Sequence, residues 1–217
     1  MQTVTQKLAL PEVYSLRRSL RLLSMGSHDP AMNLAESRAN MCFFHPDGNV
    51  SVEATQEESF LQVTLAGPGC EWLLPRLPDC FGLNDDPGCF HPEGRVARLI
   101  AEHKGVHLPR LPVVFHRLVQ IVLQQLVTWE EAAAAWRRMT QRFGAAAPGP
   151  GELTVGPSPE ALKSIGYYDL VDCGALPRQA RLIMRLATEH QRIERLAVES
   201  KTKLAKYLLT LPGIGPW

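Results

Sequence analysis

Seven residues at the carboxyl end of the chain combine features that suit contact with a phosphate group. Leu211-Pro212-Gly213-Ile214-Gly215-Pro216-Trp217 places one glycine on each side of an aliphatic residue and a proline directly afterwards. Glycine permits positive φ and leaves no side chain between backbone and ligand, and proline suits the first turn of a helix. A basic segment with an apolar stripe, residues 201–209, precedes them. The pattern predicts a helix, a tight hairpin and the start of a second helix, with backbone N–H groups directed at an anion. The alternative is an ordinary helix–glycine–helix turn.

The distribution of charge points in the same direction as the hairpin. The whole chain has a formal net charge of only +1. Residues 1–110 carry a net charge of −3 and residues 111–217 a net charge of +4, and residues 178–206 alone carry eight basic against three acidic side chains. A basic second half is the pattern expected for phosphate contact, although a solvated helix face would show the same excess.

Composition restricts the class of protein. With 217 residues, of which 45% are hydrophobic, the chain can bury a real core. No apolar run approaches the length of a membrane span and no signal sequence opens the chain, so we expect a soluble cytoplasmic protein. The five cysteines form no C-x-x-C pair and indicate neither a disulfide framework nor a zinc site; their positions are 42, 70, 80, 89 and 173.

The first half of the chain alternates between apolar and polar residues, which is typical of strands with one buried face. Val50 and Val52 share one phase, and Leu61, Val63 and Leu65 share another, with turn residues between the two runs. Helices are predicted over 72–77 and 96–102. Antiparallel strands with few helices indicate a small α+β domain, for which we expect residues 1–108.

The second half repeats with the period of a helix. Six apolar residues fall at i, +3, +4, +7, +8 and +11, which predicts a buried helix stripe: Phe115, Leu118, Val119, Val122, Leu123 and Leu126. Thr128-Trp129-Glu130-Glu131 is a capping box that opens the next helix, and prolines at 159 and 177 open two more. We expect a solvated turn at 167–174, with Asp169 and Asp172. Residues 109–217 are therefore predicted to form an all-α domain after the sheet domain.

These motifs resemble the helix-hairpin-helix DNA glycosylases, and among them the bacterial DNA-3-methyladenine glycosylase II branch, which removes alkylated purines. The hairpin carries the resemblance, together with residues 81–87, residues 105–112 and the run Gln124-Gln125-Leu126-Val127-Thr128, which is similar to the family's Gln-Gln-aliphatic-aliphatic-Ser/Thr signature. Two departures are Thr128, where serine is commoner, and Val113-Val114, where Asp-Pro is common.

The resemblance implies the following DNA-contacting residues. Leu126 would be the wedge that fills the gap left by a flipped nucleotide, with Gln125 close to the lesion, although the helical period favours a core position for Leu126 instead. Thr128, Gly213, Ile214 and Gly215 would contact DNA. Gln124 and Trp217 would line the base pocket, where the face of an aromatic ring attracts a cationic alkylated base; the alternative for Trp217 is a core tryptophan.

Trp217 also bears on the reaction that the resemblance implies. Relatives that cut the DNA strand carry a lysine nucleophile at this position, so tryptophan implies a monofunctional glycosylase. The family's catalytic aspartate follows the second hairpin helix, whereas the seven aspartates of this chain all precede the hairpin. We therefore expect a truncated helical domain and no base excision by residues 1–217, and we assign none of the seven a catalytic role.

No cofactor is expected. An iron–sulfur cluster occurs in relatives without the sheet domain and would lie after Trp217. His103 and His107 are four residues apart, but Gly105 between them argues against a metal site on a helix. The resemblance does imply a monovalent cation on the carbonyls of Leu209, Leu211 and Ile214. The expected partner is double-stranded DNA with damaged bases, in a bacterial nucleoid, and no protein partner is evident. Two alternatives remain: a non-catalytic DNA-binding module and a glycosylase for oxidised bases.

Overall fold

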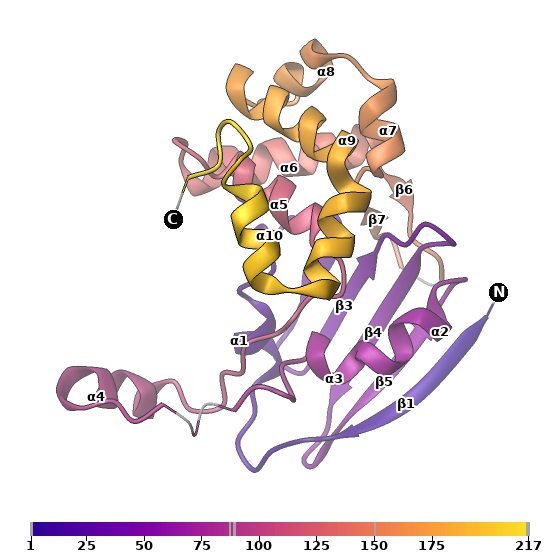
Figure 1. The fold of residues 1–217 in the computed structure, drawn as a ribbon. Helices are drawn as coiled ribbons and strands as arrows, with labels where there is room; N and C mark the ends of the chain where they lie inside the picture. The colour runs from indigo at the N-terminus through magenta and orange to yellow at the C-terminus, as the bar shows by residue number, and fades with distance from the viewer. Residues whose placement is uncertain (1, 87, 89, 150, 216–217) are drawn as a thin grey trace. The chain divides into compact units, whose positions relative to one another are not determined.

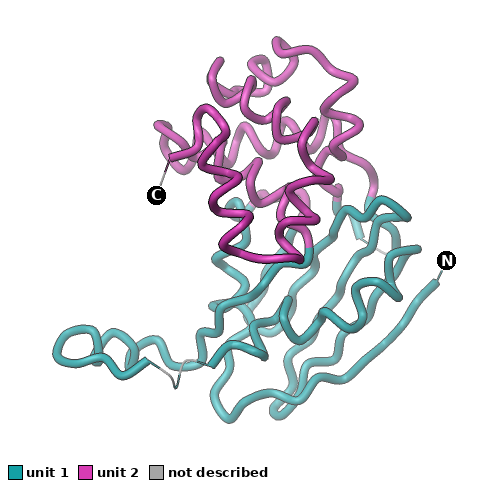
Figure 2. The backbone as a smooth tube through the Cα atoms, in the orientation of Figure 1, with its two compact units in different colours: residues 1–27, 32–112, 147–153 teal, residues 28–31, 113–146, 154–217 magenta. Residues whose placement is uncertain are grey.

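The computed structural model describes residues 2–86, 88, 90–149 and 151–215 and divides the chain into two compact units. The first unit consists of residues 1–27, 32–112 and 147–153, and the second of residues 28–31, 113–146 and 154–217 (Figure 2). The main boundary falls four residues after the one expected at 108. Residues 28–31 precede this boundary but belong to the second unit, and residues 147–153 follow it but belong to the first. The chain therefore passes between the two units more than once.

The first unit is built on a five-stranded sheet in which every neighbouring pair is antiparallel (Figure 1). The spatial order is β1-β5-β4-β3-β2. The strands are β1 (Thr3–Ala9), β2 (Met32–Leu34), β3 (Arg38–Phe43), β4 (Val50–Gln56) and β5 (Phe60–Ala66). The alternation in sequence predicted β4 and β5. The sequence interpretation missed β1. This strand lies near the start of the chain and pairs with β5.

One face of this sheet forms the core of the first unit. Val52 and Val63 are buried on it, as the period of two predicts. Short helical segments cover this face, and their Leu20 and Leu77 belong to the same apolar cluster. These segments are α1 (Leu16–Leu20), α2 (Cys70–Leu73), the 3₁₀ turn η1 (Leu74–Arg76) and α3 (Leu77–Cys80). The helix predicted over 72–77 is therefore broken into pieces, because Pro75 opens a new turn at its first positions.

Helix α4 (Gly94–Glu102) lies in the connection between the sheet and the second unit, and none of its residues is buried. Its bounds agree with the helix predicted over 96–102.

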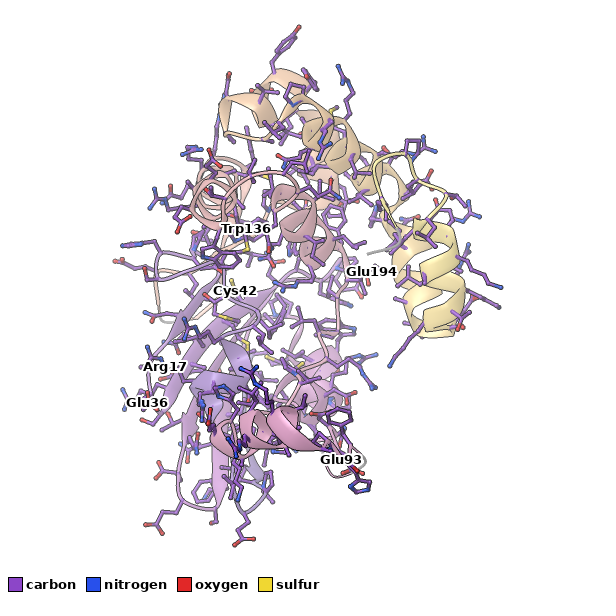
Figure 3. The ribbon with its side chains drawn as sticks, turned by 90° about the vertical axis from the view of Figure 1, so that its left-hand side faces the viewer. Arg17, Glu36, Cys42, Glu93, Trp136 and Glu194 are labelled. Atoms are coloured by element: carbon purple, nitrogen blue, oxygen red, sulfur yellow. The ribbon has the colours of Figure 1, made fainter. Side chains whose placement is uncertain are left out.

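The second unit is helical apart from one two-stranded ribbon. Its elements are α5 (Phe115–Leu123), α6 (Trp129–Phe143), β6 (Ala145–Ala146), β7 (Thr154–Val155), α7 (Pro159–Ser164), α8 (Tyr167–Asp172), α9 (Pro177–Glu199) and α10 (Lys201–Leu208). Helix α9 is the organising element, since it packs against α5, α7, α8 and α10. Its carboxylate Glu194, labelled in Figure 3, accepts the backbone N–H groups of Val114 and Phe115 at 2.9 and 2.7 Å and so caps the amino end of α5.

Two local expectations for this unit have opposite outcomes. The capping box at Thr128 is confirmed, because the Thr128 side chain accepts the Glu131 N–H and the Glu131 carboxylate accepts the Thr128 N–H. The solvated turn expected at 167–174 is wrong, because residues 167–172 form α8. Asp169 accepts the Gly166 N–H at 2.9 Å and an Arg142 hydrogen bond at 3.0 Å, so it caps a helix and pairs with a cation. Asp172 is exposed as expected.

Within the described residues, no helix has the length and apolar character needed to cross a membrane.

Candidate nucleic-acid interface

The turn between α5 and α6 presents one large apolar side chain to solvent. Helix α5 ends at Leu123, three residues before the end of the predicted stripe. Leu126 consequently leaves the buried face. Its side chain is 75% exposed and its φ is +58°, the only positive φ among the described non-glycine residues. The core position that the helical period favoured for Leu126 is therefore wrong, and the end of α5 is the reason.

A left-handed leucine is a costly conformation. Its Cβ approaches the following carbonyl oxygen, at a cost of roughly 1–2 kcal/mol. Because the side chain is exposed, burial of apolar surface does not offset this cost. Such a residue persists only where the surrounding structure over-determines it, and residues of this kind concentrate at binding and catalytic sites. The left-handed conformation of Leu126 is therefore not explained by local backbone preferences and indicates a binding or catalytic role.

Gln179 of α9 supplies the constraint on this turn. Its side chain is 1% exposed, and its Nε2 donates to the carbonyl oxygens of Leu123 at 3.2 Å and of Gln125 at 2.7 Å. Its Oε1 accepts the N–H of Leu176 at 2.8 Å. The Gln125 carbonyl belongs to the peptide that joins Gln125 to Leu126. A hydrogen bond to this oxygen therefore fixes the peptide plane from which the φ of Leu126 is measured.

The predicted hairpin follows α10 as a tight turn. The Leu211 N–H donates to the Leu208 carbonyl at 2.9 Å, and the Ile214 N–H donates to the Leu211 carbonyl at 3.1 Å. Leu211 is buried and anchors the turn, whereas Gly213 is exposed with a φ of +99°. The N–H groups of Gly213 and Gly215 donate to no other described residue. They are thus available to an acceptor from outside the chain.

Gln125 connects the turn after α5 to the hairpin. Its side chain is 9% exposed, and its Nε2 donates to the Gly213 carbonyl at 3.1 Å. The resemblance had placed both residues at a DNA surface without relating one to the other. The structure brings them into direct contact within the second unit.

The remaining residues of the signature are engaged in local structure. The Thr128 hydroxyl accepts the Glu131 N–H at 3.3 Å and lies 3.1 Å from the Glu131 carboxylate, so helix capping already uses it. The Gln124 Nε2 donates to the Gln120 carbonyl at 3.1 Å. Ile214 and Gly215 are half-buried in the hairpin. Trp217, the proposed wall of a base pocket, lies outside the described residues.

Four of the thirteen basic residues of the second half lie on one face of α9, which also carries Glu189. Spacings of three, four and seven residues place Arg178, Arg181, Arg185 and Arg192 within one stripe. All four are exposed. Within the part of the chain that the structure describes, none of them forms an ion pair with a carboxylate. Two instead lie over aromatic rings, Arg181 over Tyr167 at 5.2 Å and Arg192 over Tyr207 at 4.2 Å from the ring centroids. A stripe of this kind can approach a polyanion without first breaking internal salt bridges.

The metal expectations divide into two cases. The described residues contain no group of three or more His, Cys, Asp or Glu side chains that could hold a metal ion. The His103 Nδ1 lies 2.6 Å from an Arg18 guanidinium nitrogen, and His107 is buried against Tyr14, so these two histidines do not converge. For the carbonyl site, the Leu211 oxygen accepts the Ile214 N–H, while those of Leu209 and Ile214 accept no hydrogen bond from the described residues.

Sequence reasoning missed Gln179. A local signal existed, because Gln179 stands at the third position of a helix that begins with Pro177, where a glutamine side chain commonly accepts the N–H of the preceding cap. That signal predicts the bond to Leu176. It does not predict the two bonds to residues more than fifty positions earlier.

Comparison with known proteins gives a fold likeness and no sequence family. No protein-family model and no curated protein matches the chain. Among solved structures, 3-methyladenine DNA-glycosylase from Archaeoglobus fulgidus superposes with a TM-score of 0.80 at 18% identity, over 97% of this chain and 75% of that one. The Clostridium acetobutylicum 8-oxoguanine glycosylase/lyase, solved in complex with dsDNA containing cytosine opposite 8-oxoG, superposes with a TM-score of 0.71 at 13% identity, over 100% and 75% of the two chains. Its apo-form gives a TM-score of 0.72 at 13% identity, over 99% and 75%. The chain therefore has the α+β fold of these DNA glycosylases.

Proposed function

We propose that this protein is a base-excision DNA repair glycosylase that binds duplex DNA at a damaged base through the turn at Leu126 and the hairpin at Gly213–Gly215. One observation carries the proposal: the exposed, left-handed Leu126 directly follows Gln125, whose carbonyl accepts a hydrogen bond from buried Gln179 and whose side chain donates to the hairpin. Nothing in the stability of the free protein explains an apolar side chain held in solvent at a conformational cost.

The two elements have complementary roles in this proposal. A base inside a duplex must leave the stack before its glycosidic bond can be attacked, at a cost of a few kcal/mol. Insertion of an apolar side chain between base steps offsets that cost, and Leu126 is the side chain available for insertion. The N–H groups of Gly213 and Gly215 bind a backbone phosphate near the lesion. The arginine stripe of α9 adds the salt-dependent attraction for DNA.

We further propose alkylated purines as substrate and hydrolysis of the N-glycosidic bond, without strand cleavage. The residue at position 217 is tryptophan, which cannot form the Schiff base that a lyase requires. The TM-score of 0.80 for the archaeal 3-methyladenine glycosylase, against 0.71 for the 8-oxoguanine glycosylase/lyase, supports this choice at the level of fold. Gln124 and Trp217 would contact the extruded base. Hydrolysis also needs a group that stabilises positive charge on the sugar, and we assign that role to no residue of 1–217.

Oxidised purines are a second candidate substrate, since the Clostridium enzyme shares the fold over the whole of this chain. The partner in either case is double-stranded DNA carrying a damaged base.

A monovalent cation would fit the hairpin carbonyls. Those of Leu209 and Ile214 accept no hydrogen bond from the described residues, and the Leu211 carbonyl keeps one lone pair beside its bond to Ile214. When bound there, the cation would hold the hairpin in the conformation that exposes its N–H groups. A higher unfolding temperature in potassium than in tetramethylammonium chloride at equal ionic strength would support such a site.

The proposal is tested by binding and excision on matched duplexes. Four duplexes of one sequence would carry an undamaged adenine, an alkylated purine, 8-oxoguanine and a tetrahydrofuran abasic analogue. We expect tighter binding to the abasic and alkylated duplexes than to the undamaged one, and loss of this preference in Leu126→Ala. Residues 1–217 are expected to show the binding preference without excision. Formation of abasic sites in the alkylated duplex would establish the glycosylase and overturn that expectation, and formation in the 8-oxoguanine duplex alone would establish the second candidate. Equal affinity for all four duplexes would reject the damage-specific proposal and favour a non-catalytic DNA-binding module.

A further inference from the structure

A chain of side-chain amides runs from the amino end of α9 to the hairpin. The Leu176 N–H donates to Gln179, and Gln179 donates to the carbonyls of Leu123 and Gln125. The Gln125 side chain then donates to the Gly213 carbonyl. Every link lies within the second unit. Three segments far apart in sequence are therefore joined by two buried glutamines.

The two glutamines act at different points of the same turn. Gln179 fixes the main chain immediately before Leu126 through the Gln125 carbonyl, at 2.7 Å. Gln125 itself fixes the hairpin through its side chain. A displacement of the Gln125 peptide would therefore change both the direction of the Leu126 side chain and the position of the Gly213 carbonyl. Contact with DNA at the Leu126 turn would therefore displace the hairpin, and contact at the hairpin would displace the turn, because one rigid peptide connects them.

We propose that Gln179 is a positioning residue that holds Leu126 in its left-handed, exposed conformation and links it to the hairpin. The expected effect of Gln179 on DNA binding rests on the function proposed above, whereas its effect on the conformation of the turn does not. Both N–H groups of the Gln179 amide are used as donors to carbonyls, and its oxygen is used as an acceptor. Only a side chain with two donors and one acceptor on the same planar group satisfies all three partners.

Glutamate tests this requirement with almost no change of shape. In Gln179→Glu the ionised carboxylate still accepts the Leu176 N–H, but its other oxygen faces two carbonyl oxygens and repels them. Protonation restores one donor. Because Gln179 is buried and its hydrogen-bond partners among the described residues are all backbone groups, the introduced carboxyl should titrate above its usual range. The defect should therefore be large at about pH 8 and should recover as the pH falls towards about 5. A space-filling role would show no such recovery.

Matched variants isolate the effect. Gln191→Glu places the same charge on an exposed position of α9 and is the control. Gln179→Met keeps the volume, removes both donors and cannot titrate, so its defect should be the same at every pH. At about pH 8 we expect Gln179→Glu to lower the preference for the abasic duplex over the undamaged duplex by about tenfold, as the removal of one strong interaction would. Affinity for undamaged DNA should change less.

A local signal separates this inference from the proposed function. Trp129 is the first residue of α6, half exposed and three residues after Leu126. Its resonance in protein labelled with 5-fluorotryptophan, assigned by Trp129→Phe, reports on the turn without DNA. The inference requires this resonance to shift in Gln179→Glu at about pH 8 and to return at about pH 5, with no change in Gln191→Glu. If it shifts while the parent shows no preference for damaged duplexes, the positioning role stands and the proposed function fails. If it keeps the parent position in folded Gln179→Glu and Gln179→Met, the positioning role is overturned, whatever the DNA assays show.

Discussion

The side-chain amide of Gln125 donates a hydrogen bond to the carbonyl of Gly213, which lies 88 residues later in the chain. This bond joins the two segments to which the proposal assigns different roles, insertion at the lesion and binding of a backbone phosphate. If both contacts form on one DNA molecule, the distance between the Leu126 turn and the hairpin must be set before binding. The bond from Gln125 to Gly213 links the two directly and sets that distance.

Removal of that bond should therefore affect damage recognition more than stability. In Gln125→Ala we expect the free energy of unfolding to fall by about 1 kcal/mol, the usual net value of one hydrogen bond. The preference for an abasic over an undamaged duplex should fall more than this loss of stability explains among folded molecules. Gln141→Ala, at an exposed position of α6, is the control. An unchanged preference in folded Gln125→Ala would show that the two elements act independently.

Leu126→Gly should make the free protein more stable and the complex weaker. Glycine adopts a positive φ without steric cost, so relief of the left-handed leucine should add about 1 kcal/mol to the free energy of unfolding. The same change removes the side chain proposed for insertion, and affinity for the abasic duplex should fall. Ile121→Gly is the contrast, since Ile121 is also an exposed apolar residue but lies within α5, where glycine destabilises. A loss of stability in Leu126→Gly would argue against the strain.

Thr128 should prove to be primarily a helix cap. Thr128→Ala removes the acceptor of the Glu131 N–H and should lower the free energy of unfolding by about 1 kcal/mol, whereas Thr128→Ser keeps the hydroxyl and should restore most of it. Chemical denaturation of the two variants measures the difference. A change in DNA affinity without a change in stability would instead assign Thr128 to direct contact.

The arginine stripe of α9 should set the salt dependence of DNA binding. For every phosphate that an arginine no longer neutralises, the slope of log K against log salt should decrease by about 0.9. We expect the combined change of Arg178, Arg181 and Arg185 to glutamine to lower this slope on undamaged duplex and to leave the preference for damaged DNA unchanged. The control is the change of Arg95 and Arg98, which lie on exposed α4, to glutamine. Equal slopes for parent and stripe variant would remove this surface from the interface.

Glu194 should make the protein less stable as the pH rises from acid. Burial raises the pKa of its carboxyl, opposed by the N–H groups of Val114 and Phe115 and by the charge of His190. The folded state then binds more protons than the unfolded state between the unfolded and folded pKa values, so the Glu194 contribution to stability falls with rising pH in that window. Glu194→Gln should lack this decline, and Glu199→Gln, at an exposed position of the same helix, should retain it. Unfolding temperatures across the window measure the difference between the curves.

The sequence by itself determined the elements whose rules are local. Alternation predicted β4 and β5, the capping box predicted the start of α6, and glycine spacing predicted the turn at Gly213. Each depends on residues only a few positions apart, so adjacent side chains contain the whole signal. The resemblance of the tail to helix-hairpin-helix glycosylases also drew on such short motifs, and the fold likeness agrees with it.

Only the tertiary structure decided where Leu126 lies. Its place in the helical period predicted burial, but α5 ends at Leu123, whose carbonyl accepts a hydrogen bond from Gln179. The pairing of β1 with β5 and the contact of Gln125 with Gly213 were hidden for the same reason. Their partners are separated by at least fifty residues, and nothing in the composition of either segment specifies the other. A buried side-chain amide bonds to the carbonyls that have no other donor once the helices are packed. Which carbonyls these are is determined only when the helices have come together.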